Sequence, residues 1–424
     1  MKEVFHSVRL DADKCQGCTN CIKRCPTGAI RIRDKKAYII KDRCIDCGEC
    51  IRICPHHAKY AINDNLNILL RYKHKVALPA PALYGQFNNL ENVDYVLTAL
   101  KRIGFDDVFE VSKSAELISS ATRVMMKEDE LVKPVISSAC PAVVRLIQTR
   151  FPNLIGNLLP VFAPVDLAAK LAREKARKET GLDDEDIGIF FITPCPAKTT
   201  SFKNPLGYET MGVNGSIAIK DIYKSLLHEM DNLKPMELEM LSDSGIIGVG
   251  WASSSGEAAG LLKERYLAAD GVENVIKILE ELEDEKLNDL DFIELNSCIG
   301  GCVGGVLTVE NPFVARARIQ KLRKFMPVSC NSLSGDYDIT KLSWTKSLPP
   351  STSMKLADNV IMAMKMMAQM KEIEEALPGL DCGICGAPSC RELADDIVRG
   401  YSKATDCIFY KIQKEKEEMA KNDD

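Results

Sequence analysis

The sequence of 424 residues lacks the features that direct a chain into a membrane, across one or onto nucleic acid. It has no run of about 18 uncharged apolar residues, so we expect no membrane-spanning helix. The N-terminal segment MKEVFHSVRLDADKC lacks an apolar core of signal-peptide length, which predicts a cytoplasmic protein. The net charge of −5 and the pI near 5.8 argue against a basic surface for nucleic acid.

The composition also excludes wholesale disorder and a small disulfide scaffold. Hydrophobic residues make up 46% of the chain and charged residues 27%, as in soluble globular proteins. At about 150 residues per domain, the length predicts two to four domains. The outlier is cysteine, with 17 residues. Because a reducing cytoplasm disfavours disulfides, so many cysteines indicate metal ligands or redox centres.

The cysteines fall into three zones, and only Cys330, predicted to be a packed thiol, lies outside them. The 16 zone members form four sets of four, the number of thiolates that holds four cubane clusters. The N-terminal zone holds Cys15, Cys18, Cys21, Cys25, Cys44, Cys47, Cys50 and Cys54, the middle zone Cys140, Cys195, Cys298 and Cys302, and the C-terminal zone Cys382, Cys385, Cys390 and Cys407.

The N-terminal zone is an internal repeat. A C-x2-C-x2-C-x3-C-P run at residues 15–26 recurs 29 residues later, at 44–55. This duplication resembles the bacterial two-cluster ferredoxin, in which the fourth cysteine of each run ligates the other cluster. A zinc module is the alternative, although zinc sites do not normally show two such runs. The resemblance implies an electron relay with one cluster on Cys15, Cys18, Cys21 and Cys54 and another on Cys44, Cys47, Cys50 and Cys25.

The C-terminal zone begins with DCGICGAPSC at residues 381–390 and continues, after a helix predicted over 391–400, to Cys407. It looks like the single [4Fe–4S] module of corrinoid iron–sulfur proteins and of electron-transfer subunits of ion pumps. A structural zinc site is the alternative. Residues 353–377 before it are predicted to form one long amphipathic helix, whose methionines serve packing and which is compatible with a homodimer.

The middle of the chain, from Val76 to Trp344, alternates short apolar runs with helical stretches such as 166–181 and 253–270. The runs VKPVISSAC, DIGIFFITPC and LDFIELNSC are strand candidates that each lead directly into a cysteine. This alternation predicts an α/β domain with parallel sheets covered by helices. Ligands in such folds gather at the carboxyl ends of the strands. We therefore expect the four cysteines of the middle zone to meet at one metal site.

Three segments of this region resemble the active-site signatures of the [FeFe]-hydrogenases. They are SSACPAVVRL at 137–146, TPCPAK at 193–198 and FIELNSCIGGCVGG at 292–305. A lone cysteine is by default a core residue, but the flanking prolines and glycines make coincidence a poor explanation. The resemblance covers essentially the whole chain and implies three domains: an α+β ferredoxin-like domain with two [4Fe–4S] clusters (1–75), an α/β catalytic domain (76–346), and a long helix with a small helical [4Fe–4S] module (347–424).

The resemblance also implies roles for individual residues. The cysteines of the middle zone would hold the cubane of an H-cluster, and Cys302 would bridge to a diiron unit with CO, cyanide and dithiolate ligands. Lys198, by default a solvated lysine, would donate a charge-assisted hydrogen bond to a cyanide ligand. Glycines in this loop would give the cofactor room to approach. The loop glycines are Gly300, Gly301, Gly304 and Gly305, and the cofactor-lining residues are Pro81, Ala82, Pro194, Trp251 and Gly301.

Four positions depart from the family signatures. Ala139 stands where most members have a proton-relaying cysteine, and Ser201 stands where they have a glutamate of the same proton path. Asn296 and Thr193 each replace a methionine. Because alanine has no exchangeable proton, the usual relay cannot operate here. This combination is similar to the divergent hydrogenases to which a sensory role is ascribed.

Three functions stay open at this point. The first is an enzyme that interconverts H₂ with protons and electrons through ferredoxin-type carriers. The second is a signalling protein that turns H₂ over slowly, with Glu294 or Glu257 carrying protons unless each is only a surface charge or a helix cap. The third, a non-catalytic iron–sulfur assembly protein, is disfavoured by Lys198 and Cys302. We expect a slow hydrogenase with a sensing role, served by a redox carrier and by maturation proteins.

Overall fold

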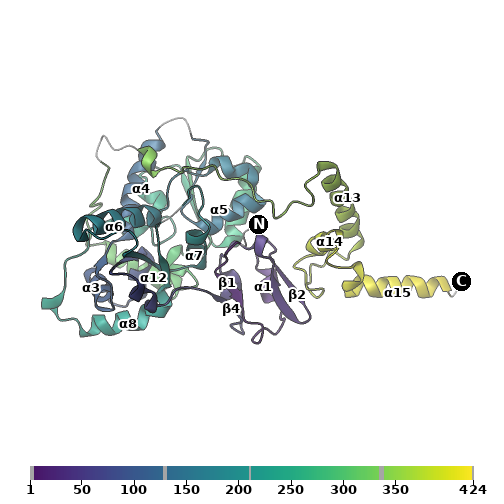
Figure 1. Ribbon diagram of the computed structural model, residues 1–424. Helices are drawn as coiled ribbons and strands as arrows, with labels where there is room; N and C mark the ends of the chain where they lie inside the picture. Colours follow the sequence, from purple (N-terminus) through teal and green to yellow (C-terminus); the bar gives the residue numbers. More distant parts are fainter. Residues whose placement is uncertain (1–3, 128–130, 210–211, 334–338, 423–424) are drawn as a thin grey trace. The chain divides into compact units, whose positions relative to one another are not determined.

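The computed structural model describes residues 4–127, 131–209, 212–333 and 339–422, and the chain forms two compact units (Figure 1). The smaller unit combines Met1–Ile45, Glu49–Ala61 and Ser351–Asp424, and the larger combines Asp46–Gly48 and Ile62–Pro350. The C-terminal segment therefore shares a unit with the ferredoxin-like segment. None of the helices in the described ranges has the length and apolarity to cross a bilayer.

The N-terminal part of the smaller unit is built from two short antiparallel ladders. Strand β1 (Val8–Leu10) pairs with β4 (Lys59–Ala61), and β2 (Ile30–Arg33) pairs with β3 (Lys36–Ile39). Helices α1 (Asn20–Lys23) and α2 (Glu49–Arg52) each carry a cysteine of one run. Cys15, Cys21 and Cys50 are buried in the small core between these elements, where they pack with apolar side chains such as Ile22 and Ile30.

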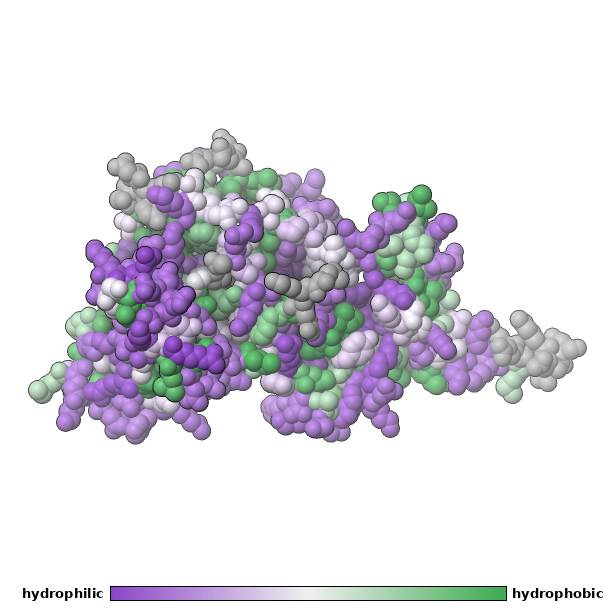
Figure 2. Space-filling model, viewed as in Figure 1, coloured by the Kyte–Doolittle hydropathy of each residue, from purple (hydrophilic) through white to green (hydrophobic). Residues whose placement is uncertain are grey.

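The C-terminal part of this unit consists of helices α13 (Val360–Ala376), α14 (Cys390–Val398) and α15 (Ile408–Asn422). The predicted helix over 353–377 thus begins seven residues late, because the side chain of Asn359 caps it by accepting the backbone N–H of Met362 at 3.1 Å. Met370 is the one buried residue of α13. The prediction that the methionines serve packing is wrong for Met362, Met364 and Met367, which are exposed on an apolar surface (Figure 2).

The larger unit contains two parallel sheets, as the alternating pattern predicts. One has the strand order β6-β5-β8-β9 and the other the order β10-β11-β7. Their residues are mostly buried because helices cover them. The strands of the first sheet are β5 (His74–Pro79), β6 (Asp107–Val108), β8 (Ile187–Thr193) and β9 (Gly215–Ala218), and those of the second are β7 (Val135–Ile136), β10 (Tyr266–Asp270) and β11 (Phe292–Asn296).

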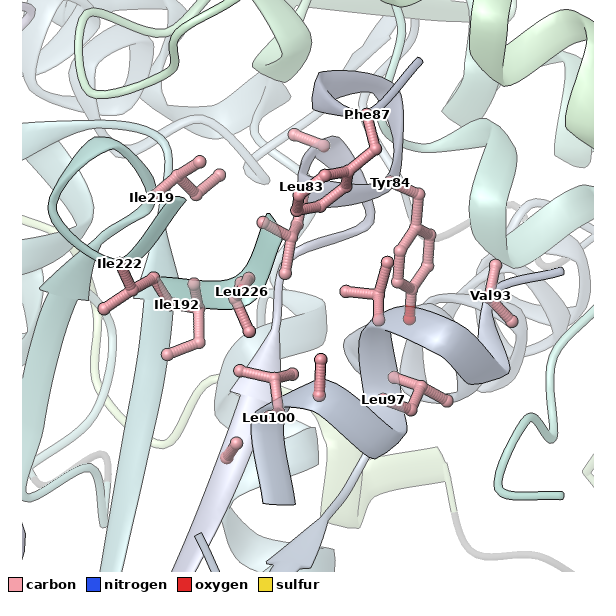
Figure 3. Packing of buried hydrophobic residues seen from close by; sticks show 14 of the residues in the cluster. Leu83, Tyr84, Phe87, Val93, Leu97, Leu100, Ile192, Ile219, Ile222 and Leu226 are labelled. Atoms are coloured by element: carbon pink, nitrogen blue, oxygen red, sulfur yellow. The ribbon is translucent and has the colours of Figure 1, made fainter. Parts of the chain in front are cut away.

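The main core of this unit lies between the first sheet and two of its helices. Figure 3 shows Leu97 and Leu100 of α3 (Asp94–Arg102) and Leu226 of α8 (Ile219–Asn232) packed near Leu83 and Ile192. All five side chains are fully buried. Further helices complete the unit: α4 (Val111–Met125), α6 (Pro164–Thr180), α9 (Ile246–Gly250), α11 (Val272–Glu283) and α12 (Pro312–Arg323).

Of the two helices predicted in the middle region, one is confirmed and one is wrong. Residues 166–181 fall in α6, which ends at Gly181 with φ of 69°. Residues 253–270 instead form the single turn α10 (Gly256–Gly260) followed by β10. The segment YLAAD pairs in parallel with FIELN over five residues, and this pairing overrides the helix propensity of leucine and alanine.

The tight packing at the start of α10 yields a stability prediction. A Cβ atom on Gly256 would lie 1.9 Å from the carbonyl oxygen of Gly250, whereas one on Gly156 would meet no atom within 4 Å. We therefore expect Gly256→Ala to lower the free energy of unfolding by about 1–3 kcal/mol, as overpacking does. Gly156→Ala should change it by less than about 1 kcal/mol. Anaerobic urea unfolding measures both, and equal losses would contradict the prediction.

Candidate active site

A cavity of about 100 Å³ lies where strands of both sheets of the larger unit end. β5 and β8 of one sheet and β7 and β11 of the other lead into its wall. This is the edge at which parallel α/β sheets place their ligands. The cysteines of the middle zone line this one cavity together: Cys140, Cys195, Cys298 and Cys302.

Two of these cysteines stand immediately before helices that begin with proline. Cys140 caps α5 (Pro141–Arg150) and Cys195 caps α7 (Pro196–Lys203), both with extended backbone. Proline suits the first helical position, because the N–H there has no acceptor within the helix. The positive ends of two helix dipoles therefore lie at the sulfur-bearing residues, where they favour the thiolate forms.

The glycine-rich loop around Cys302 is held by close backbone contacts. A Cβ on Gly301 would lie 2.4 Å from the nitrogen of Ser254, and one on Gly305 would lie 2.2 Å from the carbonyl oxygen of Pro194. Both glycines line the cavity, whereas Gly300 and Gly304 are not among the described residues of its wall. All four glycines give room to other parts of the chain, and only Gly301 and Gly305 also border the cavity, so the expected approach of a cofactor stays a prediction for these two.

Most of the other predicted site residues also lie in this wall. Trp251 does so, with its indole N–H donated to the Ser119 hydroxyl at 3.0 Å. The prediction that Ala82 lines the cavity is wrong, since Ala82 is buried in the main core and Ala80 lines the cavity instead. Ser201 on α7 is buried outside the described wall. The remaining predicted residues that line the cavity are Pro81, Ala139, Pro194, Lys198 and Asn296.

The donor set fits an iron–sulfur centre. Burial raises the pKa of Cys195 to about 11, and neighbouring thiols add to the effect. Burial likewise raises the pKa of Cys302, next to Cys195 and Cys140. Thiols placed this close together around one cavity become thiolates when metal ions supply the compensating positive charge. Four such sulfur donors are what a [4Fe–4S] cluster requires.

Two buried glutamates are linked to the backbone of Ala139. The Ser137 hydroxyl accepts the backbone N–H of Ala139 at 3.2 Å and donates to the carboxylate of Glu257 at 2.5 Å. Burial, with the charge of Glu294 adding to it, raises the pKa of Glu257 to about 8. Burial also raises the pKa of Glu294, which accepts a hydrogen bond at 2.7 Å from the cavity-lining Asn296. The alternative that either is a surface charge is therefore wrong.

Glu294 also binds the start of α10, since it accepts the backbone N–H groups of Ser255 and Ala258, both at 2.9 Å. Its role as a helix-terminal acceptor, one of the alternatives weighed from the sequence, is thus confirmed. The carboxyl group of Glu294 also accepts the hydrogen bond from Asn296 and lies near Glu257. It therefore connects the cavity wall to Glu257.

The structure adds Asp166 to the predicted residues, since it lies close enough to Lys198 for that charge to act on its pKa. Its carboxylate accepts the Tyr208 hydroxyl at 2.6 Å and the backbone N–H of Ala163 at 3.2 Å. Burial raises the pKa of Asp166 to about 6, against the opposing charge of Lys198. Pro164 and Val165 just before it line the cavity, while Asp166 faces a second cavity of about 290 Å³. Its only sequence signal is an acidic residue in the first turn of a helix that begins with proline.

The cysteines of the smaller unit also gather in groups. One pocket is lined by a first-run site of four cysteines and another by a C-terminal site of four. The thiols of Cys44 and Cys25 both help to raise the pKa of Cys50, after burial as the main cause, so these three lie near one another. The first-run site is Cys15, Cys18, Cys21 and Cys54, and the C-terminal site is Cys382, Cys385, Cys390 and Cys407. The second-run site of Cys44, Cys47, Cys50 and Cys25 stays a prediction.

The remaining thiol, Cys330, is exposed, so the prediction that it packs in the core is wrong. Its backbone N–H is donated to the buried carboxylate of Glu116 at 3.0 Å, and this bond holds the loop with its side chain outward.

Comparison with known proteins gives three family matches along the chain. The model for the iron-only hydrogenase large subunit, C-terminal domain, matches residues 73–256 and 209–306, which is more than half of the sequence. The chain belongs to the iron-only hydrogenase family. A 4Fe–4S dicluster domain matches residues 7–55, and an Fe–S cluster domain matches residues 377–409 of this hydrogenase-family chain. The predicted family and both accessory iron–sulfur segments are confirmed.

Individual relatives are distant from this hydrogenase-family chain. The periplasmic [Fe] hydrogenase large subunit of Nitratidesulfovibrio vulgaris is 27% identical over 213 residues, which are 46% of this chain and 51% of the relative. Iron hydrogenase 1 of Clostridium pasteurianum is 25% identical over 143 residues, 31% of this chain and 25% of the relative. The chain thus spans about half or less of the length of these relatives. A solved variant of the [FeFe]-hydrogenase HydA1 from Chlamydomonas reinhardtii aligns over 62% of this chain and 90% of its own, with 16% identity and a TM-score of 0.49.

The raised pKa of Glu257 yields a prediction about stability and pH. The folded protein keeps this carboxyl protonated up to about pH 8, whereas an unfolded chain releases the proton near pH 4.5. The free energy of unfolding of the wild type therefore falls as pH rises between these values, by at most about 1.4 kcal/mol per pH unit. Glu257→Gln has no proton to release, so its free energy of unfolding should rise relative to that of the wild type from pH 6 to about pH 8 and then keep a constant difference.

Thermal unfolding of protein samples with equal iron content measures this difference in stability between the variant and the wild type. The exposed Glu185→Gln variant is the control and should keep a constant difference from the wild type across the same range. A difference for Glu257→Gln that does not change with pH would contradict the prediction.

Proposed function

We propose that this chain interconverts H₂ with protons and electrons at an H-cluster in the cavity of the larger unit. The observation that carries the proposal is the meeting of Cys140, Cys195, Cys298 and Cys302 with Lys198 around one cavity, inside the segment matched by the hydrogenase family. The four thiolates would hold the cubane, and Cys302 would also bridge to the diiron unit. When bound, the diiron unit supplies the metal site at which H₂ is split or formed.

The residues around the cavity suit an anionic cofactor that must be kept from bulk water. Lys198 places an ammonium group in a wall that is otherwise largely apolar, with Val111, Val165 and Phe191 among its members. A cation in such surroundings binds a cyanide ligand more strongly than it would in water. Retention of this lysine and of the glycine-flanked Cys302 argues against the alternative of a non-catalytic assembly protein.

Proton movement falls to different residues from those of most family members. Ala139 lines the cavity without an exchangeable proton, but the Ser137 hydroxyl is bonded to its backbone and to Glu257. Glu294 leads back to the cavity through Asn296. Carboxyl groups whose pKa values lie near neutral pH are suited to take up and release protons there. We therefore assign the proton path to this glutamate pair.

A path that ends in a serine hydroxyl and an amide, instead of a thiol at the cavity, favours slow turnover. Slow turnover suits a chain that reports the level of H₂, so we extend the proposal to hydrogen sensing. The same proposal implies the partners of the chain and its location in the cell. We infer a ferredoxin-like carrier, dedicated maturation proteins, a second copy of the chain as a further partner, and a cytoplasmic location.

The glutamate pair is tested by turnover. We expect Glu257→Gln to lower H₂ evolution and oxidation by about 10²- to 10⁴-fold, the usual contribution of a proton relay. Ala139→Cys should stay within about tenfold of the wild type, because the new thiol would lack the next member of the usual relay, whose glutamate position is Ser201 in this chain. The control is Glu110→Gln, which removes another buried carboxylate that binds Tyr84 at 2.9 Å and lies outside the described cavity wall.

Infrared spectra of each variant report whether the diiron unit is bound, so a loss of turnover can be separated from a loss of cofactor. Unchanged turnover in Glu257→Gln with the cofactor bound would contradict the proton path. Turnover of the wild type as fast as that of bulk-producing hydrogenases would contradict the sensing role.

Metal content tests the cofactor assignment itself. We expect about 18 iron atoms per matured chain, because four cubanes hold four each and the diiron unit holds two. Infrared bands of CO and cyanide should appear only after maturation with the diiron unit and should shift in Lys198→Ala. About eight iron atoms after careful anaerobic reconstitution, or no CO and cyanide bands after maturation, would overturn the assignment.

A further inference from the structure

Three arginines and three carboxylates form a largely buried network inside the smaller unit. The arginines lie within residues 31–43 and the carboxylates within residues 392–396. Arg31 of β2 is fully buried and donates to both oxygens of Asp396, at 2.7 and 3.0 Å, and to Glu392 at 2.6 Å. Arg43 donates to Asp395 at 2.6 Å and to Glu392 at 3.1 Å. We call these residues, with Arg33, which donates to Asp396 at 3.0 Å, the arginine–carboxylate clamp.

The clamp holds α14 in one orientation against the N-terminal part of the unit. Guanidinium groups that bind carboxylates through two hydrogen bonds fix the angle as well as the distance between partners. Burial alone would raise the pKa of Asp395, but the hydrogen bonds from Arg43 and Arg399 outweigh it and lower the pKa. The carboxylate is therefore charged, and the clamp is a true ionic contact.

Backbone contacts bring the cysteine-bearing loop itself against β2. The N–H of Ile32 is donated to the carbonyl oxygen of Gly386 at 2.8 Å, and Arg33 donates to the carbonyl oxygen of Cys385 at 3.0 Å. A Cβ on Gly386 would lie 2.0 Å from the carbonyl oxygen of Ile32, and its φ is 84°. Glycine is thus required for this approach, which places the ligand residue Cys385 directly beside β2.

The same contacts select one of the two N-terminal metal sites. Ile32 lines the pocket of the first-run site, so one residue stands between that pocket and the Cys385 loop. Lys23, two residues after the first-run ligand Cys21, donates to the carbonyl oxygen of Pro388 at 2.9 Å. The residues that contact the Cys385 loop therefore lie beside the first-run site, whereas Glu392 of α14 contacts Arg43, which precedes the second-run Cys44.

We propose that the clamp docks the C-terminal site on the first-run site, so that the smaller unit is one electron-transfer module in which these two clusters are direct neighbours. Exchange between them moves one electron, with one cluster oxidised as the other is reduced and no bond formed or broken. The inference needs only the iron–sulfur clusters and not hydrogenase activity. The C-terminal cluster would then exchange electrons with the first-run cluster of the same chain, and not only with an external carrier.

Electron paramagnetic resonance of the fully reduced, cluster-loaded chain tests the proposal, since neighbouring reduced clusters split or broaden each other's signals. The first-run and second-run clusters are themselves expected neighbours, so the test is made in Cys47→Ser, which lacks an expected ligand of the second-run cluster. We expect an interaction in this variant and its loss when Cys382→Ser and Cys407→Ser are added. Adding Cys18→Ser, in the first-run site, should abolish it as well. An interaction that survives the added Cys18→Ser, or none in Cys47→Ser with the other clusters loaded, would overturn the proposal.

Variants of the clamp test the docking device. In the Cys47→Ser background, Glu392→Gln with Asp396→Asn should keep the iron content of that variant but lose the magnetic interaction. The control is Glu375→Gln, which removes an exposed carboxylate of α13 that pairs with exposed Lys371, and it should keep the interaction. If the clamp variant does not fold, the cysteine variants decide the question alone. Because no arm measures H₂ turnover, a failure here is separate from a failure of the proposed function.

Discussion

The larger unit depends on one constraint, which is that parallel strands of two different sheets end at the same place. β5 and β8 on one side and β7 and β11 on the other each run into the wall of one cavity. Residues far apart in the sequence therefore meet without long connecting loops. The prolines after Cys140 and Cys195 start helices at once, so each sulfur-bearing residue lies at the positive end of a helix.

Desolvation then decides what the groups around this cavity can do. Burial raises the pKa of the thiols and of the glutamates alike, because water no longer stabilises their charged forms. The consequences differ between the two kinds of group. Thiols need metal ions to become thiolates, which favours cluster binding. Without such ions, the pKa values of Glu257 and Glu294 are raised towards neutral pH, which suits these groups to proton exchange.

In the smaller unit, buried cysteines share a small core with apolar side chains. Its two segments are joined by buried pairs of arginine and carboxylate. Such pairs add little net stability compared with apolar contacts, because both charges lose their hydration. They do impose one geometry, since any other arrangement leaves a charge without a partner. The pairs therefore fix how α14 lies against the N-terminal part of the unit more than they add to its stability.

Much of this organisation can be predicted from the sequence, because its signals are local. The spacing within each cysteine run, the prolines after Cys140 and Cys195, and the apolar runs before them predict metal sites at the ends of parallel strands. The family resemblance rests on the same short segments. Helix α6 could be predicted for a similar reason, since its apolar periodicity and the glycine that ends it lie within one stretch of chain.

Only the tertiary structure decided the features that depend on distant partners. YLAAD becomes a strand because β11 lies beside it, and Glu257 is a buried acid because Ser137 and Glu294 lie next to it. Asp166 and the clamp carboxylates look like ordinary helix charges in the sequence. Burial and ion pairing depend on residues that come together only in the folded chain, whereas ligand spacing and helix starts depend on immediate neighbours.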